Sequence, residues 1–166
     1  MSAVPYLTDV LKTLKIDIIA LAEHWLHKSQ FHFLDTTDNV NYKAYGKSVD
    51  EYHTDLYSCN ARGGVALMVS KALCPYVTEI VIESNRLCGI EIKFPGEHII
   101  FLITVYLPAA TQSYDSFSNE LEYLMDIYRA YAQHGTVFLL GDFNCKIEGP
   151  RYNVNHNKRS KLFKIF

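Results

Sequence analysis

The chain has 166 residues, of which 49% are hydrophobic and 13% aromatic, and its formal net charge is −2. That length and composition suit one folded domain with a sizeable core, and no apolar run approaches the ~20 residues of a membrane-spanning helix. The opening residues, MSAVPYLTDVLK, lack the basic and apolar regions of a signal peptide. The four cysteines form no CxxC pair, which indicates reduced thiols in an intracellular protein.

The first third of the chain has two periodic stretches followed by a polar one. In residues 4–14, apolar side chains recur at three- and four-residue spacing, which predicts a helix. Residues 16–25 predict a short buried strand that ends in a charged side chain. Residues 32–64 are polar and irregular, so we expect them to form a long surface excursion.

Expected strands dominate the rest of the chain. Successive segments rich in β-branched and aromatic residues, with turn signals between them, are 64–70, 77–83, 87–94 and 98–108. An amphipathic helix is expected over 114–135, where Gly135 ends it, and a last strand over 136–142. Helix, strand, a meander of strands, helix and strand together predict a layered α/β or α+β domain whose sheets are covered by helices.

Charge and histidine placement give two weaker signals. Residues 151–166 hold five basic residues and no acidic one, so residues 1–150 carry −7. A basic tail could contact nucleic acid, but an ordinary solvated helix face is the simpler explanation. His24 and His27 form an HxxH pair, which alone is a weak metal signal, and we expect surface histidines there.

Polar side chains follow three of the expected strands. Glu23 follows the apolar run DIIALA, Tyr106 follows FLITV, and Asp142 and Asn144 follow VFLL. Rigid strands aim such side chains while the adjoining loops open space, so we expect these residues to converge at one rim of the sheets. Because residues i and i+2 of a strand share a face, Asp142 and Asn144 should point the same way, with Phe143 opposite. The alternatives are a solvated glutamate, a half-buried tyrosine and an Asx-type turn.

The order of several segments carries a family resemblance. These segments are IIALAEHWL, ARGGVALMVS, NRLCGIEIKF, FLITVYLPAA and VFLLGDFNCKI. In this order they resemble the endonuclease/exonuclease/phosphatase superfamily over about residues 5–165. Within it, the chain is most similar to the apurinic-type endonuclease domain of non-LTR retrotransposon reverse transcriptases. Gly-Asp-Phe-Asn after an apolar strand is the most specific element of the resemblance.

The resemblance implies a fold, a reaction and roles for the four residues. The fold is an α+β, four-layer sandwich of two packed, mainly antiparallel sheets flanked by helices. The reaction is hydrolysis of phosphate esters with Mg²⁺ or Mn²⁺, here on DNA, which also implies access to the nucleus. Glu23 would bind the metal through oxygen, and Asp142 would orient and deprotonate the attacking water. Asn144 and Tyr106 would donate hydrogen bonds to the phosphoryl oxygens.

The sequence departs from the family pattern at both ends. The family's first strand ends in an asparagine, and the matching region would precede Met1. The family's last strands carry a second aspartate and an Asp-His pair, but after Asn144 the one histidine, His156, lies among polar residues. We therefore expect a domain over 1–166 that is incomplete, lacking the first strand and the C-terminal strands. With the site incomplete, we expect weak or no activity and exposed apolar surface beside the first or last strand.

Two other functions stay open at this stage. The chain could be a phosphatase or phosphodiesterase of the same superfamily that acts on a small or lipid substrate, although no substrate-reading residue is visible. It could also be a non-catalytic remnant of a mobile element. No residue pattern indicates a protein partner.

Overall fold

The computed structural model describes residues 4–37, 41–51, 63–145 and 158–163. The helices are α1 (Val4–Leu14), α2 (His32–Thr37), α3 (Tyr114–Ala132) and α4 (Lys158–Phe163), with short 3-10 turns at Lys28–Gln30 and Cys74–Tyr76. The strands are β1 (Ile18–Ala22), β2 (Tyr42–Lys47), β3 (Val65–Ser70), β4 (Val77–Ile80), β5 (Leu87–Ile92), β6 (Ile100–Tyr106) and β7 (Thr136–Asp142).

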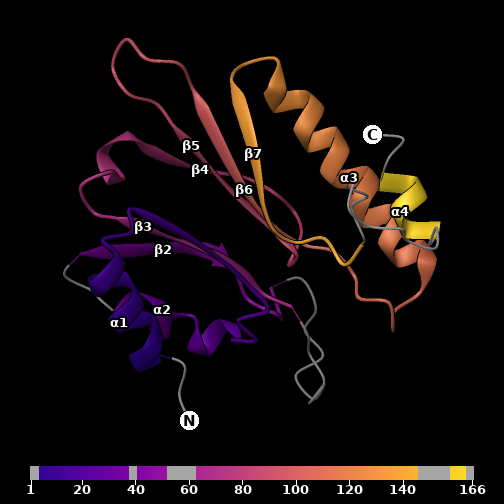
Figure 1. The fold of residues 1–166 in the computed structure, drawn as a ribbon, viewed down its shortest axis with the longest axis horizontal. Helices are drawn as coiled ribbons and strands as arrows, with labels where there is room; N and C mark the ends of the chain where they lie inside the picture. Colours follow the sequence, from indigo (N-terminus) through magenta and orange to yellow (C-terminus); the bar gives the residue numbers. More distant parts are fainter. Residues whose placement is uncertain (1–3, 38–40, 52–62, 146–157, 164–166) are drawn as a thin grey trace.

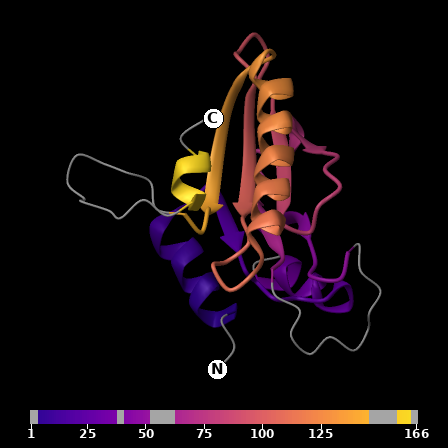
Figure 2. The ribbon, with the colours of Figure 1, turned by 90° about the vertical axis from the view of Figure 1, so that its right-hand side faces the viewer.

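These elements form four layers. A sheet of β1, β3 and β2 packs against a sheet of β4, β5, β6 and β7, with α1 and α2 outside the first sheet and α3 outside the second (Figure 1). Turned by 90°, the molecule shows α3 lying along the second sheet and α4 beside it (Figure 2). The expected fold class, an α+β sandwich of two sheets flanked by helices, is confirmed.

The first sheet, which we call sheet A, is antiparallel throughout in the order β1-β3-β2. Its central strand β3 is fully buried from Val65 to Val69. Alternation along the strand sends Val65 and Leu67 into the core between the sheets, while Met68 packs with Leu11 of α1. The run of apolar residues in β3 thus reflects burial on both faces.

The second sheet, sheet B, joins three antiparallel strands to one parallel strand. β4, β5 and β6 pair in antiparallel register, and β7 pairs with β6 in parallel after the chain crosses over through α3. Ser113 starts α3 as its N-cap by accepting a hydrogen bond from the Ser116 N–H. The buried face of α3, with Phe117 and Leu121, covers Ile103 and Val105 of β6. Because β6 and β7 run parallel, their C-terminal ends meet at one edge.

Two of the sequence-based predictions about the elements of the fold are wrong. The polar stretch 32–64 is not only a surface excursion, because it contains α2 and β2; residues 52–62 lie outside the described part of the chain. Its core contacts come from tyrosines, since Tyr42 and Tyr45 are 8% and 7% exposed, and the Lys43-Ala44 pair between them hides the strand pattern. The expected meander also breaks after β3, because the chain passes from sheet A to sheet B around Cys74–Tyr76.

Both β1 and β7 lie at sheet edges. On β7, Phe138 and Leu140 are 49% and 37% exposed, while Val137 and Leu139 pack on the α3 side. The expectation of exposed apolar surface beside the last strand is confirmed. Across the described ranges, no helix is both long and apolar enough to span a membrane.

Candidate active site

Glu23 reaches the rim of the sandwich on a left-handed backbone. It follows the last residue of β1, and its φ is 57°. Its carboxylate oxygen Oε1 accepts a hydrogen bond from the hydroxyl of Tyr106, which ends β6 in the other sheet. Residues with a side chain rarely adopt such a φ, and functional sites are where this strain concentrates.

His24 holds this backbone in place. Its ring Nδ1 accepts a hydrogen bond from the Leu26 N–H at 3.0 Å, so the neutral ring carries its proton on Nε2, which donates to the Lys47 carbonyl at 3.1 Å. The ring also packs tightly on Gly64, where a Cβ would lie 2.5 Å from it. Burial lowers the pKa of His24, and the bond to the Lys47 carbonyl opposes that shift. The prediction of a surface histidine is therefore wrong for His24.

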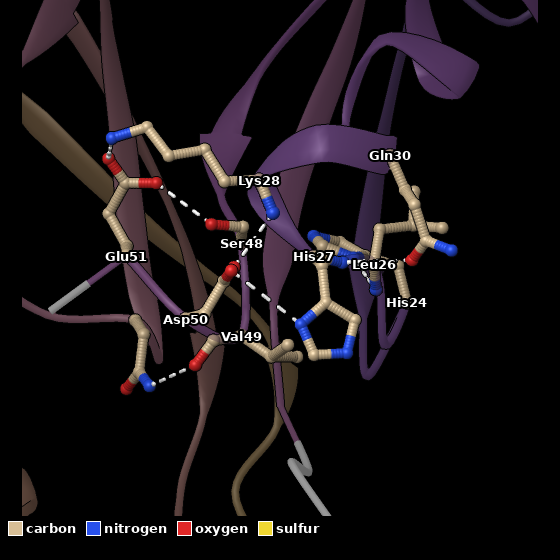
Figure 3. A network of polar contacts seen from close by, with 10 residues as sticks. His24, Leu26, His27, Lys28, Gln30, Ser48, Val49, Asp50 and Glu51 are labelled. Carbon is tan, nitrogen blue, oxygen red and sulfur yellow. Dashed lines mark hydrogen bonds and ion pairs between the residues drawn. The ribbon is translucent and has the colours of Figure 1, made fainter. Parts of the chain in front are cut away.

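A polar network fixes the rest of this loop (Figure 3). The Lys28 N–H donates to Asp50 Oδ1 at 2.7 Å, and the ring of His27 lies 3.6 Å from the same carboxylate. Glu51 accepts from the Ser48 hydroxyl and lies 3.6 Å from the Lys28 ammonium. These contacts join the loop after β1 to the loop after β2. We call residues 23–26 the sheet A arm of the site.

Tyr106 forms the centre of the site. It is 1% exposed, and burial, followed by its hydrogen bond to Glu23, raises its pKa to about 12. The hydroxyl is therefore protonated at neutral pH and acts as a donor. The guanidinium carbon of Arg86 lies 5.1 Å from the centre of the tyrosine ring. Arg86 donates to Gln112 at 3.1 Å through Nη2, while its buried Nη1 has no partner among the described residues.

Asp142 lies beside Tyr106 at the end of β7. The two residues are register partners in the parallel β6–β7 pair, and the Leu107 N–H donates to the Asp142 carbonyl at 2.9 Å. The carboxylate is exposed, and its Oδ1 accepts from the Asn144 N–H at 2.9 Å. Asn144 in turn donates through Nδ2 to the Leu107 carbonyl at 2.9 Å. We call Tyr106, Asp142 and Asn144 the sheet B arm.

The prediction that Asp142 and Asn144 share a strand face is wrong. The strand ends at Asp142, Asn144 has a φ of 46°, and the bond from its N–H to the Asp142 carboxylate is that of an Asx turn. Phe143 packs against the core beneath α3. The turn leaves Asn144 anchored to the strand end next to Tyr106.

The structure thus brings the four sequence-predicted residues to one end of the sandwich. Glu23 and Tyr106 are in contact, Asp142 is paired with Tyr106, and Asn144 is bonded to Asp142. The strand that leads to Glu23, β1, also contacts β6 and β7.

Glu23 suits a divalent cation, since Mg²⁺ keeps most of its waters and takes one or two protein carboxylates. One of its carboxylate oxygens is bonded to Tyr106, and the other has no partner among the residues described. Within those residues, no group of three or more His, Cys, Asp or Glu side chains is placed to bind a metal.

Sequence reasoning missed two residues at this site. Arg86 directly precedes β5, and the register of β5 on β6 sets Arg86 opposite Tyr106. The carbonyl of Arg86 accepts a hydrogen bond from the Tyr106 N–H at 2.9 Å. Pairing the two neighbouring expected strands could have found it. The anchoring role of His24 had no sequence signal, because its partners lie on β2 and beside β3.

The basic tail lies largely outside the described residues, as does His156. Arg159 of α4, however, is 5% exposed and donates to the carbonyls of Pro108 and Gln112, at 2.5 and 3.1 Å. Its guanidinium also lies 4.6 Å from the ring of Phe117. Arg159 therefore anchors α4 to the loop after β6. For this residue, both the expected solvated helix face and the expected nucleic-acid contact are wrong.

Solved structures of other proteins share this fold. TDP2 from Caenorhabditis elegans matches with a TM-score of 0.61 and 23% identity, over 86% of this chain and 42% of its own. The Xenopus laevis APE2 catalytic domain matches with a TM-score of 0.65 and 17% identity, over 95% and 61%. D. rerio TDP2 complexed with a single-strand DNA product matches with a TM-score of 0.60 and 18% identity, over 86% and 54%. The chain thus spans about half the length of these proteins, and at such identities the likeness shows the fold.

Family membership rests on a match along the sequence. Among curated proteins, none matches this chain. The model of the endonuclease/exonuclease/phosphatase family matches residues 5–161, nearly the whole length. Enzymes of this family generally use divalent metal ions. By this match and by its fold, the chain belongs to the endonuclease/exonuclease/phosphatase family.

Proposed function

We propose that the chain carries the hydrolytic site of a metal-dependent DNA endonuclease of the type found in non-LTR retrotransposons. The observation that carries this proposal is the hydrogen bond that joins Glu23 to Tyr106, together with the strand register that puts Asp142 beside Tyr106. A carboxylate, a protonated phenol and an exposed carboxylate at one end of the sandwich are the groups that phosphodiester hydrolysis requires.

Each residue has one task in this proposal. Glu23 holds the divalent cation, which screens the charge of the phosphate when it is bound. Asp142 has an oxygen free of the Asx turn, and this oxygen accepts a proton from the attacking water. Tyr106 and Asn144 donate hydrogen bonds to the phosphoryl oxygens as their negative charge grows. Because the pKa of Tyr106 is about 12, it keeps its proton throughout the neutral range.

The substrate assignment is supported by the family resemblance and by the neighbours. D. rerio TDP2 was solved with a single-strand DNA product. ANGEL2, a 2′,3′-cyclic phosphatase, is a neighbour with 14% identity and a TM-score of 0.58, so the alternative of a small phosphate ester also has a relative of this fold. Supercoiled plasmid and a small phosphodiester, assayed side by side, separate the two.

The test is nicking of supercoiled plasmid by the full chain with Mg²⁺ or Mn²⁺. We expect weak, metal-dependent nicking, because Glu23 is the one carboxylate assigned to the metal and Mg²⁺ binds weakly unless several oxygens converge on it. Glu23→Gln and Asp142→Asn should reduce nicking to the background of buffer alone. Glu97→Gln, in the exposed turn at the opposite end of β6, is the matched control and should leave it unchanged. Nicking that ignores metal or survives both substitutions, or none by the unmodified chain, would overturn the proposal.

A further inference from the structure

Trp25 is an exposed aromatic side chain two residues from Glu23. It is 58% exposed, and it is the only tryptophan in the chain. Burying this indole would stabilise the fold, because large aromatic side chains contribute strongly to the energy of any contact they make. Its exposure therefore calls for a structural reason. The backbone around His24 keeps the indole exposed, and Gly63 and Tyr106 lie close to Trp25 in the structure.

The backbone at Trp25 is strained. Its φ is 57°, as at Glu23, so two left-handed residues flank His24. Such conformations cost a bulky residue free energy and persist where the surroundings enforce them. Here the ring of His24 is held inside by its bonds to Leu26 and Lys47, which leaves Trp25 on the exposed side.

A glycine pair places Trp25 next to the centre of the site. The Trp25 N–H donates to the Gly63 carbonyl at 3.2 Å. Gly63 has a φ of 125°, and a Cβ on it would lie 3.8 Å from the ring of Tyr106. One residue therefore contacts both the Trp25 backbone and Tyr106. Gly63 alone therefore separates the backbone of Trp25 from the ring of Tyr106, whose hydroxyl donates to Glu23.

A positive charge completes the surroundings. The guanidinium of Arg86 lies over the ring of Tyr106, and its Nη1 is buried beneath the site. Positive charge beneath Tyr106 favours a phosphate at the surface there, and an exposed indole suits the face of a nucleobase. Found around one tyrosine, the two suit a base and a phosphate of the same strand.

We propose that Trp25 is the stacking platform for an unpaired nucleobase next to the phosphodiester at Tyr106. This inference rests on the proposed function for the location of the phosphate, and it adds a requirement that the base be free of its partner. Stacking of this kind tolerates any base, because every base presents a π-face. Trp25 thus selects single-stranded or locally opened nucleic acid rather than a base sequence.

The test uses the intrinsic fluorescence of the full chain, which reports Trp25 alone among tryptophans. A short single-stranded oligonucleotide is titrated in buffer with EDTA, so that no hydrolysis occurs. We expect it to quench the fluorescence, whereas an abasic sugar-phosphate strand of equal length and a blunt duplex should not. Equal quenching by the abasic strand, or no quenching by the oligonucleotide, would overturn the proposal.

Variants provide a second measurement by anisotropy of a labelled oligonucleotide. Trp25→Ala should weaken binding of the single strand roughly 5- to 150-fold, the range that corresponds to loss of one stacked base. Trp25→Phe should recover most of the affinity, and neither variant should change binding of the abasic strand. Tyr76→Ala removes another exposed aromatic, at the opposite end of sheet B, and should have no effect.

This experiment separates the two proposals. Quenching without metal-dependent nicking would leave the stacking platform standing and the hydrolytic function disproved. Nicking that depends on Asp142, with no quenching and unchanged affinity in Trp25→Ala, would leave the hydrolytic function standing and disprove the stacking platform. If Trp25→Ala loses the circular dichroism signal of the folded chain, its binding data are set aside. The quenching measurement on the unmodified chain then decides the proposal by itself.

Discussion

Glu23 reaches the candidate site on a left-handed loop backbone, whereas Tyr106 and Asp142 reach it on the ends of two paired strands. The sheet A arm depends on side chains, chiefly on the ring of His24 and its bonds to Leu26 and Lys47. The sheet B arm depends on backbone pairing, which the Asx turn at Asn144 extends by two residues. The arms should therefore respond differently to substitution and to pH.

The largest expected effect is the loss of the sheet B arm in Gly141→Ala. Gly141 has a φ of 136°, and a Cβ on it would lie 2.0 Å from the Val105 carbonyl oxygen. Since that obstacle is backbone of the paired strand, we expect a loss of about 2–5 kcal/mol in the free energy of unfolding. Urea denaturation measures it. Gly96→Ala is the control, because its φ is 72° with open space around it, and should cost only about 1–2 kcal/mol.

The corresponding change in the sheet A arm is Gly64→Ala. Here the obstacle is the ring of His24, which a Cβ would approach to 2.5 Å, and the φ is 79°. We expect a loss of about 2–3 kcal/mol. The obstacle is a side chain, so removing it should relieve the clash. In the Gly64→Ala variant, adding His24→Ala should therefore lower the free energy of unfolding less than it does in the unmodified chain, which a double-mutant cycle measures. Strictly additive losses would show that His24 is not what makes Gly64 necessary.

A smaller effect is expected from acid, and only in the sheet A arm. Burial lowers the pKa of His24 from its ordinary value of 6.5, so below that pH the unfolded chain binds a proton that the folded chain resists. Folding stability should therefore fall as the pH drops from about 6.5 to the lowered pKa, by at most about 1.4 kcal/mol per pH unit.

Urea denaturation of the metal-free protein at a series of pH values, with His24→Asn as reference, isolates this contribution. All other side chains are the same in the two proteins, so their contributions cancel in the difference. A difference that stays constant from pH 7.5 to 5 would contradict the buried, neutral imidazole.

The smallest expected effect comes from uncoupling the arms in Tyr106→Phe. This change removes the hydroxyl that donates to Glu23 and keeps the buried ring. We expect a loss of about 1 kcal/mol in the free energy of unfolding, the usual net worth of one hydrogen bond. Tyr123→Phe is the control, since the hydroxyl of this exposed tyrosine accepts a hydrogen bond from the Glu83 N–H on the α3 side of sheet B. No loss of stability in Tyr106→Phe beyond that of the control would mean that the Glu23–Tyr106 bond does not couple the two arms.

Much of the fold was predictable because its signals are local. The helices α1 and α3 follow from apolar spacing, and β3 to β7 follow from β-branched and aromatic runs bounded by turn residues. β2 was missed because its core contacts are Tyr42 and Tyr45, which Lys43 and Ala44 separate, so their burial has no periodic apolar signal. The crossing from sheet A to sheet B was missed because strand order along the chain does not state which strands pair.

The sequence by itself determined which residues end the strands of the site, since Glu23, Tyr106 and Asp142 follow apolar runs whose lengths set the strand ends. Tertiary structure decided how those residues meet. The left-handed backbone at Glu23 and Trp25 exists because the ring of His24 finds partners on β2 and packs on Gly64, which is 40 positions away along the chain. Arg86 reaches Tyr106 only through the register of β5 on β6. Contacts of this kind depend on packing between distant segments, and no local pattern of residue types encodes them.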